Sequence, residues 1–193
     1  MTETKAFILA NRELLPVIEQ ITDDQWSLPV PAQMTWQPNQ TLRDIVNYHT
    51  YDDAWVPDTL AGKTAAEVGS QYDFLRTTTD TVAEYKKYNA RATDAVKNFH
   101  DLDRTTHLSY GDFPARDYLQ HITLFRGLRT YDIAQVIGHP VTLSDDLVQA
   151  LWDIIKPHEQ ALRDMHVIGE RLEVADDAPL HDQLLAMTGR QPS

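Results

Sequence analysis

The chain has 193 residues, which is long enough for one domain with a buried core and short for two. It carries 17 Lys and Arg against 29 Asp and Glu, a net charge of −12, so nucleic acids and anionic membranes would be repelled. It contains no cysteine, which excludes disulfides, thiol catalysis and metal sites built on thiolates. We therefore expect a single domain over residues 1–193 that has no nucleic-acid partner.

The N-terminal segment is polar and of mixed charge, and the apolar stretch after it is broken by Asn11, Arg12 and Glu13. A secretory signal has a basic start and an unbroken apolar stretch, and a membrane span needs roughly 20 apolar residues. Neither pattern is present, so we expect a cytoplasmic protein without a membrane partner.

Helical periodicity dominates the first sixty residues. Apolar residues at spacings of three and four predict a helix over 4–21, with a kink or late start because Pro16 lies inside it. Residues 22–40 are rich in proline and predict a loop, which Trp26 and Trp36 would pack against the body. A second helix is predicted to start at Thr41, where the segment 41–44 resembles a capping box, and to end at Gly62.

The rest of the chain continues the helical pattern. Residues 63–70 predict a linker, 73–99 a long helix and 100–113 a loop. A fourth helix is expected from Pro114 to Gly138, and a fifth over 145–166 after a Ser144 cap. The tail, 167–193, has a short extended piece at 171–174 and a last short helix that ends at Gly189. No segment strongly suggests a sheet, and the long helices with moderate loops predict an all-α antiparallel bundle.

Several polar residues stand where the helical stripes should be apolar. His49 and Asp53 are four residues apart in the second helix and therefore share its apolar face. His121, Arg129 and Asp132 lie on or beside the inward face of the fourth helix. Buried charges need opposite charges or a metal, so two helices are expected to bring interacting polar groups to one interface.

Three interpretations of these residues stand side by side. They form a structural polar cluster, or His49 and His121 bind a metal that an Asp completes, or they form an acid–base pair around a substrate cavity. Spacing alone does not separate the second interpretation from the third.

Three segments carry a resemblance to a known family. The segment 41–49, TLRDIVNYH, preceded by Trp36 and followed by DDAW at 52–55, resembles the second-helix signature of the DinB-like superfamily. More specifically, it resembles the branch that contains the N-terminal domain of mycothiol-dependent maleylpyruvate isomerase. The segment 131–138, YDIAQVIG, resembles the end of the fourth helix in that branch, and 177–178 with 182–190 resembles the tail of one of its groups. The resemblance covers essentially the whole chain.

The resemblance implies an up-down-down-up four-helix bundle, here with a short C-terminal extension. Such proteins are often dimeric and hold a divalent metal, zinc or nickel, through one His of the second helix and two ligands of the fourth. His49 matches the first ligand. Aligned on Tyr131-Asp132, the other two positions hold Phe125 and Arg129, whereas an alignment on 121–127 recovers His121 and leaves Phe125 in the other place. The metal triad is incomplete in either alignment.

An arginine can take the place of a cation, since it is always charged and offers several donors to carboxylates. We therefore expect Arg129 to pair with Asp53 beside His49, and Arg129→Ala to destabilise the fold. The side chains expected to line the site are Asp53, Phe125, Arg129 and Asp132.

The functional expectation is a homodimeric DinB-like protein with a degenerate metal site, which binds a small molecule between its second and fourth helices. The alternative is a metal-dependent thiol transferase or isomerase of the mycothiol type that completes its site unusually. The core is expected to unite the following side chains: Ile45, Val46, Phe125, Val136, Leu151 and Ile155.

Overall fold

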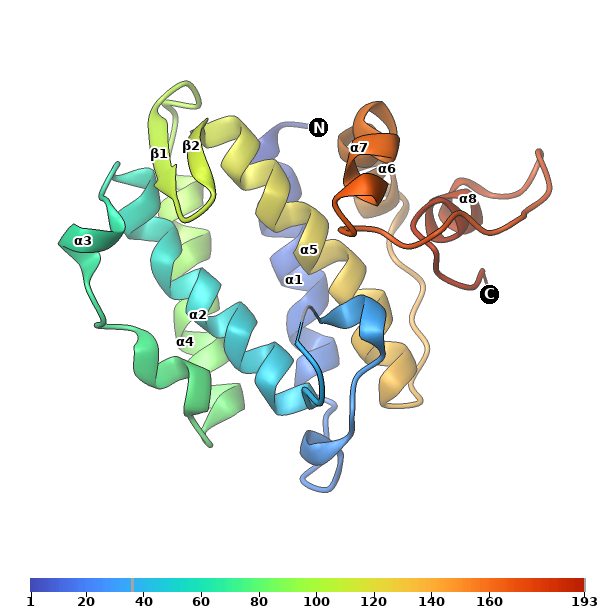
Figure 1. Cartoon of the computed structure of the whole chain (residues 1–193), viewed down its shortest axis with the longest axis horizontal. Coiled ribbons are helices and arrows are strands. Elements are labelled where there is room, and N and C mark those ends of the chain that lie inside the picture. Colours follow the sequence, from blue (N-terminus) through green and yellow to red (C-terminus); the bar gives the residue numbers. More distant parts are fainter. Residues whose placement is uncertain (36, 193) are drawn as a thin grey trace.

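The computed structural model describes residues 1–35 and 37–192, and helices predominate in it (Figure 1). The longer helices are α1 (Glu3–Ile18), α2 (Leu42–Leu60), α4 (Thr81–Lys97), α5 (Ala115–Val136) and α6 (Asp145–Ile155). The shorter ones are α3 (Ala65–Val68), α7 (Glu159–Asp164) and α8 (Leu180–Met187), with 3-10 turns at Gln25–Ser27, Ala32–Met34, Asp73–Thr77 and Lys156–His158. Two strands, β1 (Thr105–Leu108) and β2 (Gly111–Pro114), form a small antiparallel hairpin.

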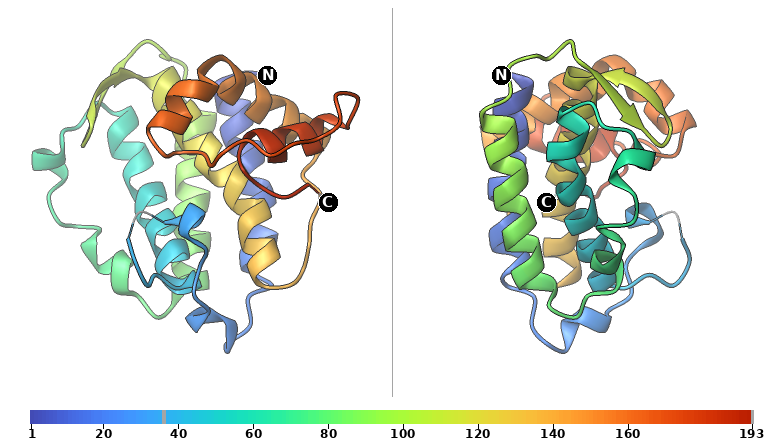
Figure 2. Two further views of the ribbon diagram at one scale, coloured as in Figure 1. Left: turned by 45° about the vertical axis from the view of Figure 1, so that its right-hand side comes forward. Right: turned by 90° about the vertical axis from the view of Figure 1, so that its left-hand side faces the viewer.

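Four helices, α1, α2, α4 and α5, lie side by side along most of their length (Figures 1 and 2). Helices α1 and α5 run in one direction, and α2 and α4 run in the opposite one. Helix α1 packs against both α5 and α4, and α2 packs against α4. By contrast, α2 and α5 contact each other over few residues, and the candidate site lies between them.

The predicted start of the second helix is confirmed. The Thr41 hydroxyl accepts a hydrogen bond from the Asp44 backbone N–H at 3.4 Å, and the Asp44 carboxylate accepts one from the Thr41 N–H at 2.8 Å. This reciprocal pair satisfies backbone donors that the first helical turn leaves free. The preceding loop packs against the body as expected, since Trp26 is buried and the Arg43 guanidinium lies over its ring. Trp36 lies outside the described residues.

Two predicted helices are interrupted in the structure. Residues 73–99 form a 3-10 turn and then α4, which begins at Thr81. The break falls where side chains of α2 bind the backbone: Asn47 donates to the Thr78 carbonyl at 2.9 Å, and Arg43 donates to the Thr79 carbonyl at 3.0 Å. The helix predicted over 145–166 is broken at Pro157, which has no N–H to continue the ladder.

The segment 100–113 was expected to be a loop, and part of it is the hairpin β1–β2. Its strands pair from Thr105 with Pro114 to Leu108 with Gly111. The Thr106 hydroxyl also donates to the Phe113 carbonyl at 2.8 Å. Strands of four residues are too short to show a clear alternation of apolar and polar residues, so periodicity could not reveal them.

The apolar core divides into several clusters rather than one. Ile45 and Val46 are buried among residues of α1, α2, α4 and α5, whereas Leu151 and Ile155 are buried where α6 meets α5 and α8. Phe125 and Val136 are half-buried at the edges of these clusters. The expectation that these six side chains share one core is therefore wrong, because they belong to two separate clusters.

The C-terminal tail is fastened to the body. Arg190 donates two hydrogen bonds to the Asp132 carboxylate, both at 2.7 Å, and the Tyr131 hydroxyl donates to the Gln191 carbonyl at 2.6 Å. Leu184, Leu185 and Met187 of α8 are buried against α6. None of the helices in the described ranges is long and apolar enough to cross a bilayer.

Candidate functional site

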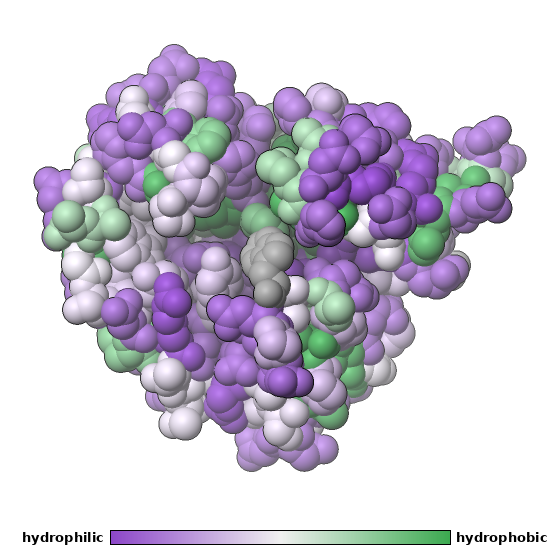
Figure 3. Space-filling model, in the orientation of Figure 1, coloured by the Kyte–Doolittle hydropathy of each residue, from purple (hydrophilic) through white to green (hydrophobic). Residues whose placement is uncertain are grey.

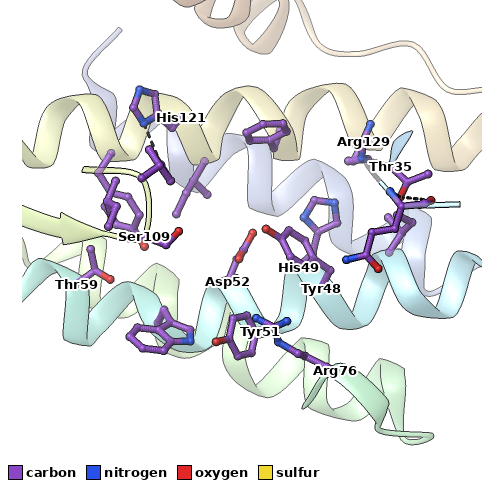
Figure 4. Close-up of a pocket in the computed structure, with 18 of the residues that line it drawn as sticks. Thr35, Tyr48, His49, Tyr51, Asp52, Thr59, Arg76, Ser109, His121 and Arg129 are labelled. Carbon is purple, nitrogen blue, oxygen red and sulfur yellow. Dashed lines mark hydrogen bonds between the residues drawn. The ribbon is translucent and has the colours of Figure 1, made fainter. Parts of the chain in front are cut away.

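Helices α2 and α5 enclose a cavity of about 420 Å³. The molecular face in Figure 3 is hollowed near its centre, and Figure 4 shows the lining side chains. The hairpin β1–β2 and the loop before α2 complete the walls. The main lining residues are Met34, Tyr48, His49, Tyr51, Asp52, Trp55, Thr59, Arg76, Ser109, Tyr110, Tyr118, His121, Ile122, Phe125 and Arg129.

One face of α2 supplies most of the polar lining. Tyr48, Asp52, Trp55 and Thr59 follow one another at spacings of three and four, and His49 lies beside Tyr48. Side chains at these spacings lie one above another on a helix, so they reach the same cavity. Tyr48 is 41% exposed and stands at the rim, whereas His49 is 3% exposed and lies deep in the wall.

A buried ion pair joins α2 to α5 behind the cavity. Arg126 and Asp53 are both fully buried, and Arg126 Nη2 donates to Asp53 Oδ1 at 2.8 Å. Arg126 also donates to the His49 carbonyl at 3.0 Å and to His49 Nδ1. Asn89 Nδ2 of α4 donates to the second Asp53 oxygen at 3.3 Å. The two charges are thus compensated by each other and by further hydrogen bonds.

These contacts set the charge states of the pair. Burial raises the pKa of the Asp53 carboxyl, and Arg126 and Asn89 act against that rise. Burial alone would lower the pKa of Arg126, but the nearby Asp53 and Asp52 raise it, so the guanidinium stays charged.

The predicted pairing of Arg129 with Asp53 is wrong, because Arg126 takes that place. Arg129 Nη1 instead donates to Asp132 Oδ2 at 2.6 Å, and its Nη2 donates to the Met34 carbonyl at 2.7 Å. Residues 126 and 129 are one turn apart, and an apolar stripe does not resolve which of two neighbouring arginines faces α2.

Some of the other predicted site residues line the cavity and some do not. His49, His121, Phe125 and Arg129 all line the cavity. Asp132 is wrong as a lining residue, since its carboxylate is held by Arg129 and Arg190. Asp53 lies behind the lining, bound to Arg126.

His49 lines the cavity and carries a hydrogen-bond donor. Its Nδ1 faces the Arg126 guanidinium, which has only donors, so Nδ1 accepts and the proton of the neutral ring lies on Nε2. Burial, with the charges of Arg126 and Arg129, holds the pKa of His49 well below its usual range. The ring is therefore neutral, and its Nε2–H is buried without a partner in the described residues.

The residues present do not fit the zinc or nickel site that the resemblance implies. The described residues contain no group of three or more His, Asp or Glu that could hold a metal ion. His49 has its available lone pair turned to Arg126, a fixed positive charge where a dication would sit. His121 lies farther along α5 in Figure 4, where its Nδ1 lies 3.2 Å from the Tyr110 hydroxyl.

Asp52 is a site residue that the sequence reasoning missed as a candidate. Its carboxylate points into the middle of the cavity in Figure 4 and has no hydrogen-bond partner among the described residues. Burial raises the pKa of Asp52 to about 7, a rise that Asp53 reinforces and that Arg126 and Arg76 oppose. Such a carboxyl can take or give a proton at neutral pH. The sequence feature that could have identified Asp52 is its position three residues after His49, on the same helix face.

Aromatic rings form the remaining wall on the α2 side. The Tyr51 and Trp55 rings are 6.0 Å apart, and the Arg76 guanidinium lies 4.1 Å over the Tyr51 ring at the rim. Trp55 Nε1 is buried and has no hydrogen-bond partner in the described part of the chain. The cavity thus combines ring surfaces with three polar groups of α2 that have no hydrogen-bond partner in the described residues.

Comparison with known proteins adds no relative. The chain matches no family model, and no curated protein or solved structure shows a match to it. The resemblance to the DinB-like superfamily therefore stays a prediction.

Proposed function

We propose that this protein binds a small organic molecule in the cavity between α2 and α5. The observation that carries the proposal is a pair of buried α2 donors without a partner in the described residues, His49 Nε2–H and Trp55 Nε1–H, together with the partly buried Asp52 carboxylate on the same helix. Buried polar groups nearly always have a hydrogen-bond partner, and a ligand in this cavity would provide one for each. A volume of about 420 Å³ is within the range of small-molecule sites.

The fold that we propose for this function is a DinB-like four-helix bundle with a C-terminal extension. In its support, α1 runs one way, α2 and α4 run the other way, and α5 returns, which is the up-down-down-up order. The α8 segment packs on the outside as the extension. In this proposal the Arg126–Asp53 pair replaces the metal of the family.

The metal-dependent thiol transferase or isomerase gains no support from the site. That chemistry needs a divalent ion held by several ligands, and the described residues near His49 offer an arginine and a phenylalanine instead. We therefore base no reaction step on a metal.

A variant that plugs the cavity tests the proposal. Ala65 lines the cavity and is exposed, so Ala65→Trp should fold and fill part of the cavity, whereas Ala66→Trp places the same ring one residue away, outside the lining. Thermal shifts are measured with a library of small polar metabolites. We expect compounds that raise the Tm of the wild type and of Ala66→Trp but not of Ala65→Trp. If no compound does so, or if both variants respond alike, the proposal is wrong.

A further inference from the structure

The chemical character of the cavity lining changes from one end to the other. In Figure 4, His49 and Arg129 lie toward one end, Asp52 is in the middle, and Thr59 and Ser109 lie toward the other end. His49 and Asp52 are three residues apart on α2, which places them about 4.5 Å apart along the helix axis. A donor and a carboxylate thus stand side by side in one wall.

The end near His49 is positively charged. Arg129 and Arg190 share the single carboxylate of Asp132, so that cluster keeps one excess positive charge. The charge of Arg126, in contrast, is balanced by Asp53. A neutral His49 donor beside an excess positive charge favours an anionic group of the ligand at this end.

The middle of the cavity favours a cation. Asp52 forms no ion pair in the described structure, and the Tyr48 and Tyr51 rings lie in the lining beside it. Carboxylates and the faces of aromatic rings both attract ammonium groups. Arg76, the other charged lining residue without an ion-pair partner in the described residues, is exposed at the rim over the Tyr51 ring.

The far end is suited to an apolar group. Trp55 lies one turn before Thr59 on α2, and the Tyr118 ring and Ile122 of α5 also contribute to the lining. Enclosed ring surface of this kind favours an aromatic or aliphatic side chain.

We propose that the ligand is a small zwitterion, an α-amino acid with an apolar or aromatic side chain. Its carboxylate accepts from His49 Nε2–H, its ammonium contacts Asp52, and its side chain lies against Trp55 and Tyr118. One carbon atom separates the two charged groups of such a molecule, so both neighbouring partners on α2 can be reached at once. This inference rests on the function proposed above and specifies its ligand class.

Three probes that share a phenylethyl skeleton and differ in their charged groups test it by titration calorimetry at pH 8: L-phenylalanine, 2-phenylethylamine and 3-phenylpropanoate. The second lacks the carboxylate and the third lacks the ammonium. We expect L-phenylalanine to bind at least about tenfold more tightly than either, since a charge-assisted hydrogen bond contributes that much.

Asp52→Asn removes the charge and keeps the shape. It should weaken L-phenylalanine and 2-phenylethylamine by about tenfold or more and should not weaken 3-phenylpropanoate. The control is Asp94→Asn, which removes one negative charge from an exposed position of α4 outside the cavity and should change none of the affinities.

The inference is overturned if either single-charge probe binds as tightly as L-phenylalanine, if Asp52→Asn weakens all three probes equally, or if none of the probes binds. Failure of the proposed function is seen separately. A probe that binds the wild type and is excluded by Ala65→Trp shows that the cavity binds ligands even where the zwitterion is wrong. If no compound of the library binds the wild type and fails to bind Ala65→Trp, the proposal that the cavity binds ligands is wrong.

Discussion

At the scale of single residues, Arg126 decides how α2 and α5 meet. Its guanidinium is fully buried, its charge is balanced by Asp53, and it also donates a hydrogen bond to the His49 carbonyl. The sequence predicted a buried arginine–aspartate pair beside His49, and the chemistry of that prediction was right although the arginine was not. A helical stripe locates a face to within about one turn, and distinguishing residue 126 from 129 needs the position of α2.

Loss of this buried pair should be costly. We expect Arg126→Met to lower the free energy of unfolding by about 3–5 kcal/mol, because Asp53 is left charged and unpaired in the core. The matched control is Arg116→Met, on the same helix, whose ion pair with Asp103 is exposed and should contribute at most about 1 kcal/mol. Urea denaturation measures both variants, and equal losses would contradict the role of Arg126.

Asp52 should make stability depend on pH. Its pKa is raised from the usual 3.8 to about 7, so between these values the folded state binds a proton that the unfolded state has lost. Stability contributed by this group is therefore lost as the pH rises toward 7. The asparagine of Asp52→Asn cannot titrate, so the Tm of this variant relative to the wild type should increase by at least ~2 °C from pH 5 to pH 8. A shift of that size corresponds to about 1 kcal/mol in a chain of this length. Parallel Tm curves for the two proteins would refute this assignment.

The same carboxyl should control binding of the proposed zwitterion. An ammonium prefers the ionised carboxylate, so the affinity for L-phenylalanine should rise as the pH increases through about 7. His49 stays neutral over this range because its pKa is lowered, so the change belongs to Asp52. Calorimetry at pH 6 and pH 8 measures it, and an affinity that is equal at both values would contradict the contact.

At the scale of elements, the helix boundaries were more predictable than the turns that shape the cavity. The capping box at Thr41 and the glycine ends at Gly62 and Gly138, with φ of +78° and +73°, are local signals that the structure confirms. The strands of the hairpin over residues 105–114 are too short for periodicity to reveal, and the break before α4 lies where Asn47 of α2 binds the backbone. Local periodicity carries no record of such contacts.

The contact of α5 with α6 depends on a glycine. A Cβ atom at Gly127 would lie 2.7 Å from a Leu151 methyl carbon, so Gly127→Ala should destabilise the protein by about 1–3 kcal/mol although alanine favours helix formation. In a Leu151→Val background the same change should destabilise the protein less, because the methyl groups of valine lie one carbon nearer the α6 backbone than those of leucine and therefore farther from residue 127. Thermal denaturation of the two single variants and the double variant measures this coupling, and additive losses would exclude it.

At the scale of the whole molecule, the periodicity of apolar residues predicted an all-α chain, and the described structure is mostly helical. The fastening of the tail by Arg190 and Asp132 was not predictable, because its partners are 58 residues apart and no local pattern connects them. The homodimer expected from the family resemblance remains a prediction. Sedimentation velocity at micromolar concentration should show a dimer, and a stable monomer would count against it.

The most direct test of the central claim is a crystal structure of the protein grown with saturating L-phenylalanine. We predict electron density for the amino acid between α2 and α5, with its ammonium at Asp52, its carboxylate at His49 Nε2, and Arg126 still paired with Asp53. Density for the amino acid elsewhere, a cavity without it, or a metal ion coordinated by His49 would contradict the account.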